Sequence, residues 1–224
     1  MIRFVNAGKA FRARRNRQEL VWPLRHFTAT IERGESTAIL APEGGGKTTL
    51  IDLVAGTENP TEGEIIRSGH ISWPASFRGM INPRMTGRQN LRFLADTYGH
   101  DFGSAYEFVQ EFAELGRYMD LLVKQCSNEQ RHRLAIAILF AMNFEFILVD
   151  DSFEAGDASF RRKVAQFIED NDDRITFFMA TSSARLAERY CRRAGILIDG
   201  GVTFYDSVEE AAAVFRRMKT EDDY

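Results

Sequence analysis

The sequence predicts an α/β fold with a mainly parallel sheet, because short apolar segments alternate with segments of helical spacing along most of its 224 residues. A glycine cluster between the apolar segment 36–40 and the helical segment 48–55 adds the order strand, glycine loop, helix. The chain is 44% hydrophobic and 27% charged, which is typical of a packed globular protein. We therefore expect one domain with a sizeable core.

Charge and apolar patterning exclude several other classes of protein. A net charge of -3 gives no global reason for binding to nucleic acid or to an acidic membrane surface. The longest apolar run, 134–142, has nine residues, whereas a bilayer requires roughly 20. The N-terminus lacks a secretory pattern, and Cys126 and Cys191 give no disulfide framework. A cytosolic location follows as the default.

The N-terminal half is expected to begin with an antiparallel β region and to continue into the glycine loop. Short strands at 2–5 and 20–24 flank the basic stretch 12–17, which is expected to be a solvated turn. A turn at 32–35 then precedes the buried strand 36–40. The predicted domain is 1–224, with a core lobe formed by 1–84 and 143–224 and an inserted helical lobe at 85–142.

The C-terminal half continues the alternation of strands and helices. The apolar strand 146–149 ends in two aspartates, and the segments after it are a helix, a strand, a hairpin and a last helix. Their ranges are 158–169, 175–180, 196–198 with 202–204, and 208–218.

The glycine loop matches the phosphate-binding pattern G-x-x-x-x-G-K-[ST], except that Ala41 replaces the first glycine. The missing side chains let backbone N–H groups approach phosphates, and the following helix points its positive end at the same place. Lys47 is expected to bridge the β- and γ-phosphates, and Thr48 to offer its hydroxyl to Mg²⁺. The alternative is a glycine-rich turn with an exposed lysine. The predicted nucleotide-binding residues are Pro42, Glu43, Gly44, Gly45, Gly46, Lys47, Thr48 and Thr49.

Two aspartates at the end of the strand 146–149 complete the predicted site. Asp150 is expected to hold Mg²⁺, directly or through water, and Asp151 to orient the attacking water. A solvated strand end is the alternative for this pair if it is taken alone.

The residues between the two motifs carry a resemblance to a known family. Residues 126–137 resemble the L-S-G-G-Q signature of ABC ATPases and the helix after it, and 154–157 resemble the D-loop of that family. The closer resemblance, carried by 63–74, 85–93 and 112–116, is to the ATP-binding subunits of capsular polysaccharide exporters. It implies a P-loop NTPase fold with a RecA-like sheet.

The resemblance also implies the cofactors and partners of the chain. The expected ligands are ATP and Mg²⁺, and the expected assembly is a dimer of ATPase subunits beneath two membrane-spanning permease subunits. The chain would be peripheral at the cytoplasmic face of the inner membrane, with no contact to nucleic acid or to the glycan. By resemblance, Phe11 stacks on adenine, Ser127 contacts the γ-phosphate across the dimer, and 76–88 faces the membrane subunit.

Four positions depart from the family pattern. Asp151 replaces the catalytic glutamate, Ser182 replaces the switch histidine, and Asn82 is the amide nearest to the glutamine that joins the two lobes. Glu129 occupies a glycine position of the signature, where an anion costs binding energy unless it meets a cation or turns outward. We expect these departures to slow hydrolysis, and restoring the family residues at 129, 151 and 182 to raise turnover.

Two functions remain open at this point. The chain is either an ATPase subunit that energises polysaccharide export, with Asp151, Ser182 and Asn82 in catalytic roles, or a degenerate nucleotide-binding subunit that regulates a mixed dimer. A soluble ABC ATPase acting on nucleic acid would predict coiled-coil heptads or tandem ATPase domains, and the sequence has neither.

Overall fold

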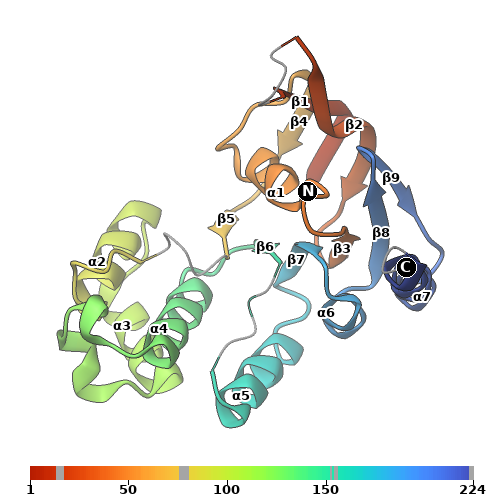
Figure 1. Ribbon diagram of the computed structural model, residues 1–224. Coiled ribbons are helices and arrows are strands. Elements are labelled where there is room, and N and C mark those ends of the chain that lie inside the picture. Colours follow the sequence, from red (N-terminus) through yellow and green to blue (C-terminus); the bar gives the residue numbers. More distant parts are fainter. Residues whose placement is uncertain (14–17, 76–80, 152, 154–155, 222–224) are drawn as a thin grey trace. The chain divides into compact units, whose positions relative to one another are not determined.

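The computed structural model describes residues 1–13, 18–75, 81–151, 153 and 156–221 (Figure 1). The chain forms two compact units. The first consists of Met1–Pro74, Glu145–Ser152 and Asp173–Tyr224, and the second of Ala75–Phe144 and Phe153–Asp172. The second unit therefore contains the segment 85–142, together with a helix that follows it in the chain.

An antiparallel sheet of three strands begins the first unit. Its order is β2 (Leu20–Ile31), β1 (Ile2–Arg12) and β4 (Glu62–Arg67). The strands β1 and β2 are longer than the sequence predicts, because irregularities in their register interrupt the alternation of buried and exposed side chains. Pro23 is tolerated inside β2 because this strand lies at the edge of the sheet.

The second sheet has six strands and is parallel except for its last strand, which confirms the predicted α/β class. The edge strand β9 pairs with β8 in the expected closing hairpin. In spatial order the strands are β5 (Ile71–Pro74), β6 (Phe146–Asp150), β7 (Thr176–Thr181), β3 (Thr37–Leu40), β8 (Arg193–Ile198) and β9 (Gly201–Phe204).

Helix α1 (Lys47–Ala55) joins the two sheets of the first unit, since it packs against strands of both. Its residues Leu50, Leu53 and Val54 are fully buried in a hydrophobic cluster that also includes Phe4 of β1 and Phe178 of β7. Two more helices, α6 (Ala184–Tyr190) and α7 (Val208–Glu221), pack against each other and against strands of the parallel sheet.

Arg67, the last residue of β4, ties this strand to the C-terminal end of α1. Its guanidinium donates hydrogen bonds to the carbonyl oxygens of Leu53, Val54 and Ile65. The bonds to Leu53 and Val54 satisfy carbonyl groups that the end of a helix leaves without an intrahelical partner. Partial burial of the guanidinium lowers the pKa of Arg67. Helix α1 is thus fixed at the end opposite to the glycine loop.

The second unit is helical, and phenylalanine rings form much of its core. Phe112 of α3 lies within 5.7 Å, between ring centroids, of four other phenylalanine rings. Those rings belong to Phe108, Phe140, Phe160 and Phe167. The helices are α2 (Gly87–Tyr98), α3 (Phe102–Ala113), α4 (Asn128–Ala141) and α5 (Ala158–Glu169), with two short 3₁₀ helices, η1 (Gly116–Asp120) and η2 (Val123–Gln125).

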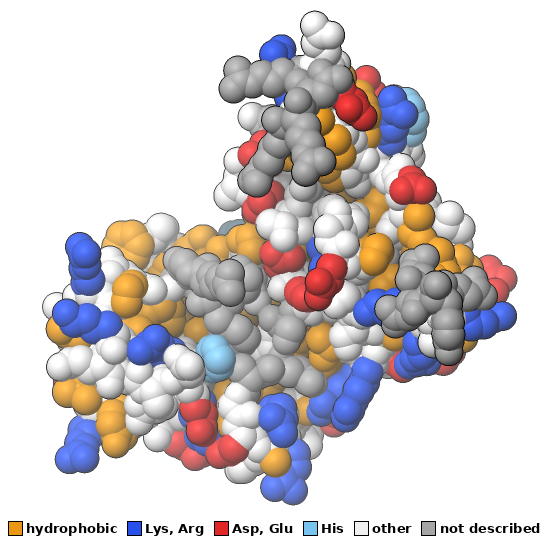
Figure 2. Space-filling view, in the orientation of Figure 1, with side chains coloured by type: hydrophobic (Ala, Val, Ile, Leu, Met, Phe, Trp, Pro, Cys, Tyr) orange, Lys and Arg blue, Asp and Glu red, His pale blue; other side chains and the backbone are white. Residues whose placement is uncertain are grey.

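The helical unit also presents apolar side chains to solvent. Phe93 on α2 is 60% exposed and Leu121 is 38% exposed. On the face shown in Figure 2, lysine and arginine side chains lie among hydrophobic ones over this unit. In the part of the chain that the structure describes, no helix is both long enough and apolar enough to cross a bilayer.

Candidate nucleotide-binding site

The glycine loop connects the buried strand β3 to the start of α1. Gly44 and Gly46 have φ values of 74° and 95°, a backbone conformation that favours glycine. A Cβ atom on Gly46 would lie 2.8 Å from the carbonyl oxygen of Pro23 in β2, so a side chain would not fit there. Gly46 is also the N-cap of α1, and no side chain caps that helix. The loop thus leaves the positive end of α1 open to an anion.

Lys47, the first residue of α1, folds back over the beginning of the loop. Its side-chain Nζ donates hydrogen bonds to the carbonyl oxygens of Pro42 and Ala41, at 2.9 and 3.4 Å. The residue is only 9% exposed. Ala41 is fully buried, and its backbone N–H donates to the carbonyl oxygen of Thr181. The alanine that departs from the glycine pattern is therefore accommodated in the loop.

Thr48 and Asp150, which the sequence analysis assigned to Mg²⁺, lie side by side. The Thr48 hydroxyl donates to Asp150 Oδ2 at 3.0 Å. Burial is the main cause that raises the pKa of Asp150; Asp151 and Asp52 also raise it, whereas the Thr48 bond and Lys47 act in the opposite direction. A carboxylate in these surroundings gains from a nearby cation.

The donor set fits Mg²⁺ in particular. A hydroxyl and a carboxylate are hard oxygen ligands, and Mg²⁺ in nucleotide sites binds few protein groups because phosphate and water oxygens complete its shell. Among the described residues, no group of three or more His, Cys, Asp or Glu side chains could hold a metal ion alone. The pair Thr48 and Asp150 therefore suits an ion that arrives with a phosphate ligand.

Asp151 and Ser182, the predicted catalytic pair, are in direct contact. Asp151 Oδ1 accepts one hydrogen bond from the backbone N–H of Ser182 and one from its hydroxyl, both at 3.0 Å. The backbone of Asp151 is held as well: its N–H donates to Ala180 and its carbonyl accepts from the Thr181 hydroxyl, at 2.7 and 2.6 Å. Two positions that the sequence presents as separate departures form one hydrogen-bonded group.

Phe11 and Asn82 lie in different units. Phe11, near the end of β1, is 40% exposed, and Lys9 Nζ lies 5.1 Å from the centroid of its ring. A partly exposed ring is suited to stacking on a planar base. Asn82 belongs to the second unit, where its side chain accepts a hydrogen bond from the backbone N–H of Arg84 at 2.9 Å.

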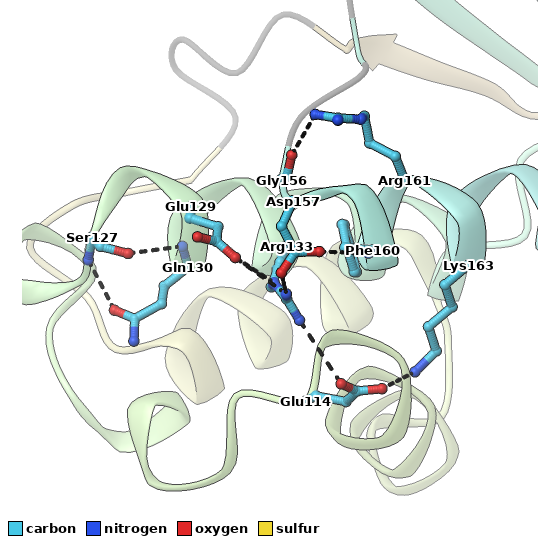
Figure 3. A network of polar contacts seen from close by, with 10 residues as sticks. All are labelled: Glu114, Ser127, Glu129, Gln130, Arg133, Gly156, Asp157, Phe160, Arg161 and Lys163. Carbon is cyan, nitrogen blue, oxygen red and sulfur yellow. Dashed lines mark hydrogen bonds and ion pairs between the residues drawn. The ribbon is translucent and has the colours of Figure 1, made fainter.

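The signature-like segment begins helix α4 in the second unit. Ser127 is the N-cap of α4 and forms a capping box with Gln130: its hydroxyl accepts from the Gln130 N–H, and the Gln130 side chain accepts from the Ser127 N–H (Figure 3). This pattern fixes the start of the helix. The serine hydroxyl is used as an acceptor, so its own proton is left to donate.

Glu129, the anion in the signature, meets a cation on its own helix. Arg133 binds Glu129 Oε1 at 3.1 Å and Asp157 Oδ2 at 2.7 Å, and it lies 3.9 Å from Glu114 Oε2 (Figure 3). Its guanidinium also lies over the ring of Phe160, at 4.9 Å from the centroid. The cost that the sequence analysis attached to Glu129 is thus offset by Arg133.

The same network fixes the start of α5. Asp157 is the N-cap of α5 and accepts from the Phe160 N–H at 2.8 Å. This bond, followed by Arg133, lowers the pKa of Asp157. Glu114 is held from the other side by Lys163, whose bond lowers the pKa of that carboxyl. Glu154 and Ala155 of the D-loop resemblance, like 76–80 of the predicted membrane-facing stretch, lie outside the described residues.

Replacing Arg133 by alanine should lower the melting temperature of the protein by about 2–4 °C, or about 1 kcal/mol, because one guanidinium contacts three carboxylates and a ring. Thermal unfolding followed by circular dichroism measures the change. Arg162→Ala is the matched control, since Arg162 is exposed on α5 of the same unit. Equal melting temperatures for the two variants would contradict a stabilising role for the network.

Sequence reasoning missed three residues that take part in these groups. Thr181 holds the Asp151 carbonyl, Arg133 joins Glu129 to Asp157, and Lys219 of α7 donates to the Ser182 carbonyl oxygen at 2.9 Å. Glu129 and Arg133 are four residues apart on a predicted helix, and this spacing predicts an ion pair between them. Lys219 lies 37 positions from Ser182, so no local pattern could join them.

Comparison with known proteins agrees with the fold and the loop geometry. Residues 24–154 match the ABC transporter family model. The polysialic acid transport ATP-binding protein KpsT of Escherichia coli is 31% identical over 97% of this chain and 99% of that protein. The capsule polysaccharide export ATP-binding protein CtrD of Neisseria meningitidis serogroup B is 34% identical over 87% of this chain and 90% of that protein.

A solved structure has the same fold. The dimeric structure of MJ0796, a bacterial ABC transporter cassette, aligns with a TM-score of 0.76 at 24% sequence identity, over 93% of this chain and 99% of that one. The resemblance found in the sequence is therefore confirmed. The chain belongs to the ABC transporter family and carries the ATP-binding domain of that family.

Proposed function

We propose that this chain binds and hydrolyses ATP and thereby energises an ABC exporter of capsular or other surface polysaccharide. The proposal of ATP hydrolysis depends on one observation: Lys47, Thr48 and Asp150 lie at the glycine loop. The Thr48 hydroxyl oxygen and Asp150 Oδ2 are 3.0 Å apart there. The transport half is supported by the similarity to KpsT and CtrD, which are named for polysialic acid transport and capsule polysaccharide export.

The loop residues would bind the triphosphate. Backbone N–H groups of residues 43–49, at the loop and the start of α1, would face the phosphates, and Lys47 would leave its carbonyl partners to reach the β- and γ-phosphates. Phe11 would stack on the base. Thr48 and Asp150 would hold Mg²⁺, which supplies positive charge against the negative charge that develops during phosphoryl transfer.

Asp151 is the group that would act on the attacking water. Its Oδ1 is occupied by Ser182, so Oδ2 is the oxygen left to accept a proton or a hydrogen bond from water. Ser182 thus holds the aspartate instead of reaching the γ-phosphate as the replaced histidine would. Asn82 would act as the amide that senses the nucleotide from the second unit.

The proposed assembly is a dimer of ATPase subunits on two membrane-spanning permease subunits, at the cytoplasmic face of the inner membrane. In it, Ser127 would complete the site of the facing subunit, and the glycan would be bound by the permease alone. The facing subunit is either a second copy of this chain or a different ATPase chain.

Steady-state ATP hydrolysis by the purified chain tests the enzymatic proposal. Turnover is expected, and it should disappear in Lys47→Ala, which controls for contaminating ATPases. A parallel titration of nucleotide binding, with Mg²⁺ and with a chelator, accompanies the assay. Mg²⁺-dependent binding without turnover would contradict the hydrolytic half of the proposal.

The transport proposal is tested in cells that carry the chain. Cells in which Lys47→Ala replaces the native residue should retain surface polysaccharide inside the envelope, detected by comparing glycan in whole-cell extracts with glycan on the cell surface. Normal surface polysaccharide in those cells, with ATPase activity lost, would contradict a role in its export.

A further inference from the structure

The carboxylate of Asp151 is held at an unusual backbone position. Asp151 has a φ of 68°, the left-handed conformation that few residues other than glycine adopt. Aspartate and asparagine are tolerated there because their short side chains bond to nearby backbone groups. In this chain the nearby group is Ser182, which donates through both its N–H and its hydroxyl. The two hydrogen bonds from Ser182 therefore compensate for the left-handed backbone conformation of Asp151.

Ser182 in turn is restrained by its neighbour in the sequence and by a residue of α7. The next residue, Ser183, is the N-cap of α6, and its backbone N–H donates to the Thr181 hydroxyl at 3.0 Å. On the other side, Lys219 Nζ donates to the Ser182 carbonyl oxygen at 2.9 Å. The residue that presents two donors to Asp151 thus has its carbonyl group, which belongs to the next peptide unit, bound to α7.

Helix α7 is well placed to hold that contact. Its residues Ala211, Ala212 and Phe215 are buried, and α7 packs against α6 and against strands β3 and β8. Lys219 lies one turn after Phe215, with its Nζ 5.1 Å from the centroid of that ring. The residue is exposed, and its side chain passes near the buried ring, with the Nζ at the Ser182 carbonyl.

We propose that Lys219 is a positioning residue for Asp151: by binding the Ser182 carbonyl it restrains the residue whose N–H and hydroxyl aim the carboxylate at the attacking water. The proposal rests on the hydrolytic role proposed for Asp151. It makes the C-terminal helix a part of the catalytic arrangement, although no atom of α7 need touch nucleotide.

Kinetics of Lys219→Gln provide the first test. The value of kcat should fall about three- to tenfold while KM for ATP changes less than about twofold, because a displaced carboxylate slows the chemical step without weakening phosphate binding. Lys219→Arg should restore most of kcat, since arginine keeps a donor at that place. Arg217→Gln, an exposed cation on the same helix, is the matched control and should behave as wild type.

Amide hydrogen exchange provides a second test that needs no turnover. In the nucleotide-free protein, the Ser182 N–H should exchange about three- to tenfold faster in Lys219→Gln than in the Arg217→Gln control, because residue 182 is less restrained once its carbonyl loses the bond to Lys219. If the wild-type chain proves unable to hydrolyse ATP, the hydrolytic proposal fails, and the exchange rates alone decide whether Lys219 fixes Ser182.

Three results would overturn the proposal: unchanged Ser182 exchange in Lys219→Gln, a rise in KM with kcat unchanged, or a failure of Lys219→Arg to recover activity when its melting temperature is that of wild type. A further check uses Asp151→Asn. In that background the Lys219→Gln substitution should not lower the residual rate, since the group that it positions no longer acts as a base. An additional loss there would mean that Lys219 acts elsewhere.

Discussion

Replacing Asp150 by asparagine should lower ATP hydrolysis by about 10²- to 10³-fold, because the substitution removes the carboxylate that accepts from Thr48 and that is proposed to hold Mg²⁺. Nucleotide binding in the presence of a chelator should change little, since the glycine loop and Lys47 are untouched. Steady-state turnover and a binding titration with and without Mg²⁺ measure the two effects. Wild-type turnover in Asp150→Asn would remove Asp150 from the proposed site.

The same substitution should raise stability at neutral pH. Burial raises the pKa of Asp150 above its ordinary value, so the folded protein binds the proton more tightly than the unfolded chain. Stability from this group is therefore lost as pH rises from the unfolded pKa, about 4, through the raised folded pKa. Above that window the asparagine variant avoids the loss.

Melting temperatures between pH 4 and pH 8 test this sign. The difference between Asp150→Asn and wild type should grow as pH increases through the lower part of that range and then remain constant. Asp96→Asn, at an exposed position on α2, is the control for the loss of one carboxylate. A variant that is less stable than wild type at pH 8 would contradict the assigned cost of burying the charged group.

Replacing Gly46 by alanine should both destabilise the protein and weaken ATP binding by more than about 10²-fold. The φ of 95° costs about 1–2 kcal/mol for any residue with a Cβ atom. In addition, the new methyl group would meet the Pro23 carbonyl oxygen at 2.8 Å, so β2 or the loop must shift. That shift would displace the backbone N–H groups of the loop that are proposed to bind the phosphates.

Gly34→Ala separates the two contributions. Gly34 has a φ of 83°, but a Cβ atom there would have no neighbour within 4 Å. The control should lose stability through backbone strain alone and should keep its affinity for ATP. Thermal unfolding and a nucleotide titration of both variants provide the comparison, and equal losses of stability with unchanged affinity would show that the loop accommodates the methyl group.

Much of the fold was readable from the sequence because its central elements are strongly patterned. The strand at 146–149 and the helix at 158–169 agree with β6 and α5 within a residue. By contrast, β4 was not predicted, since Ile65 is its only buried residue and the strand lies at a sheet edge. The short helix α6 was also missed, because seven residues hold too few turns to display a period.

The candidate site was readable only in part, for a similar reason. The residues from Pro42 to Thr48 carry a local pattern whose spacing reflects one loop and one helix. The contact between Asp151 and Ser182 joins the ends of two strands 31 residues apart. Their identities could be compared with the family pattern one at a time, but only the structure relates the shorter acid to the serine that binds it.

The contact between Asp151 and Ser182 changes the turnover that is expected when the family residues are restored at these two positions. A glutamate at 151 would carry one more methylene than the two bonds to Ser182 accommodate, and it would occupy the left-handed backbone conformation without them. A histidine at 182 would lack the hydroxyl that Asp151 accepts from. Gains in turnover from either change alone are therefore not to be expected, and the two positions need to be exchanged together.

Arg67 couples helix α1 to strand β4 in the first unit. Helix α1 begins at the glycine loop. Near its C-terminal end, the carbonyl oxygens of Leu53 and Val54 accept hydrogen bonds from Arg67 of β4. The helix thus connects the candidate nucleotide-binding site to the antiparallel sheet, and Arg67 fixes its C-terminal end. Nucleotide binding at the start of α1 can therefore restrain β4 through this helix without any contact to that strand, so that a more rigid sheet and tighter nucleotide binding would favour each other.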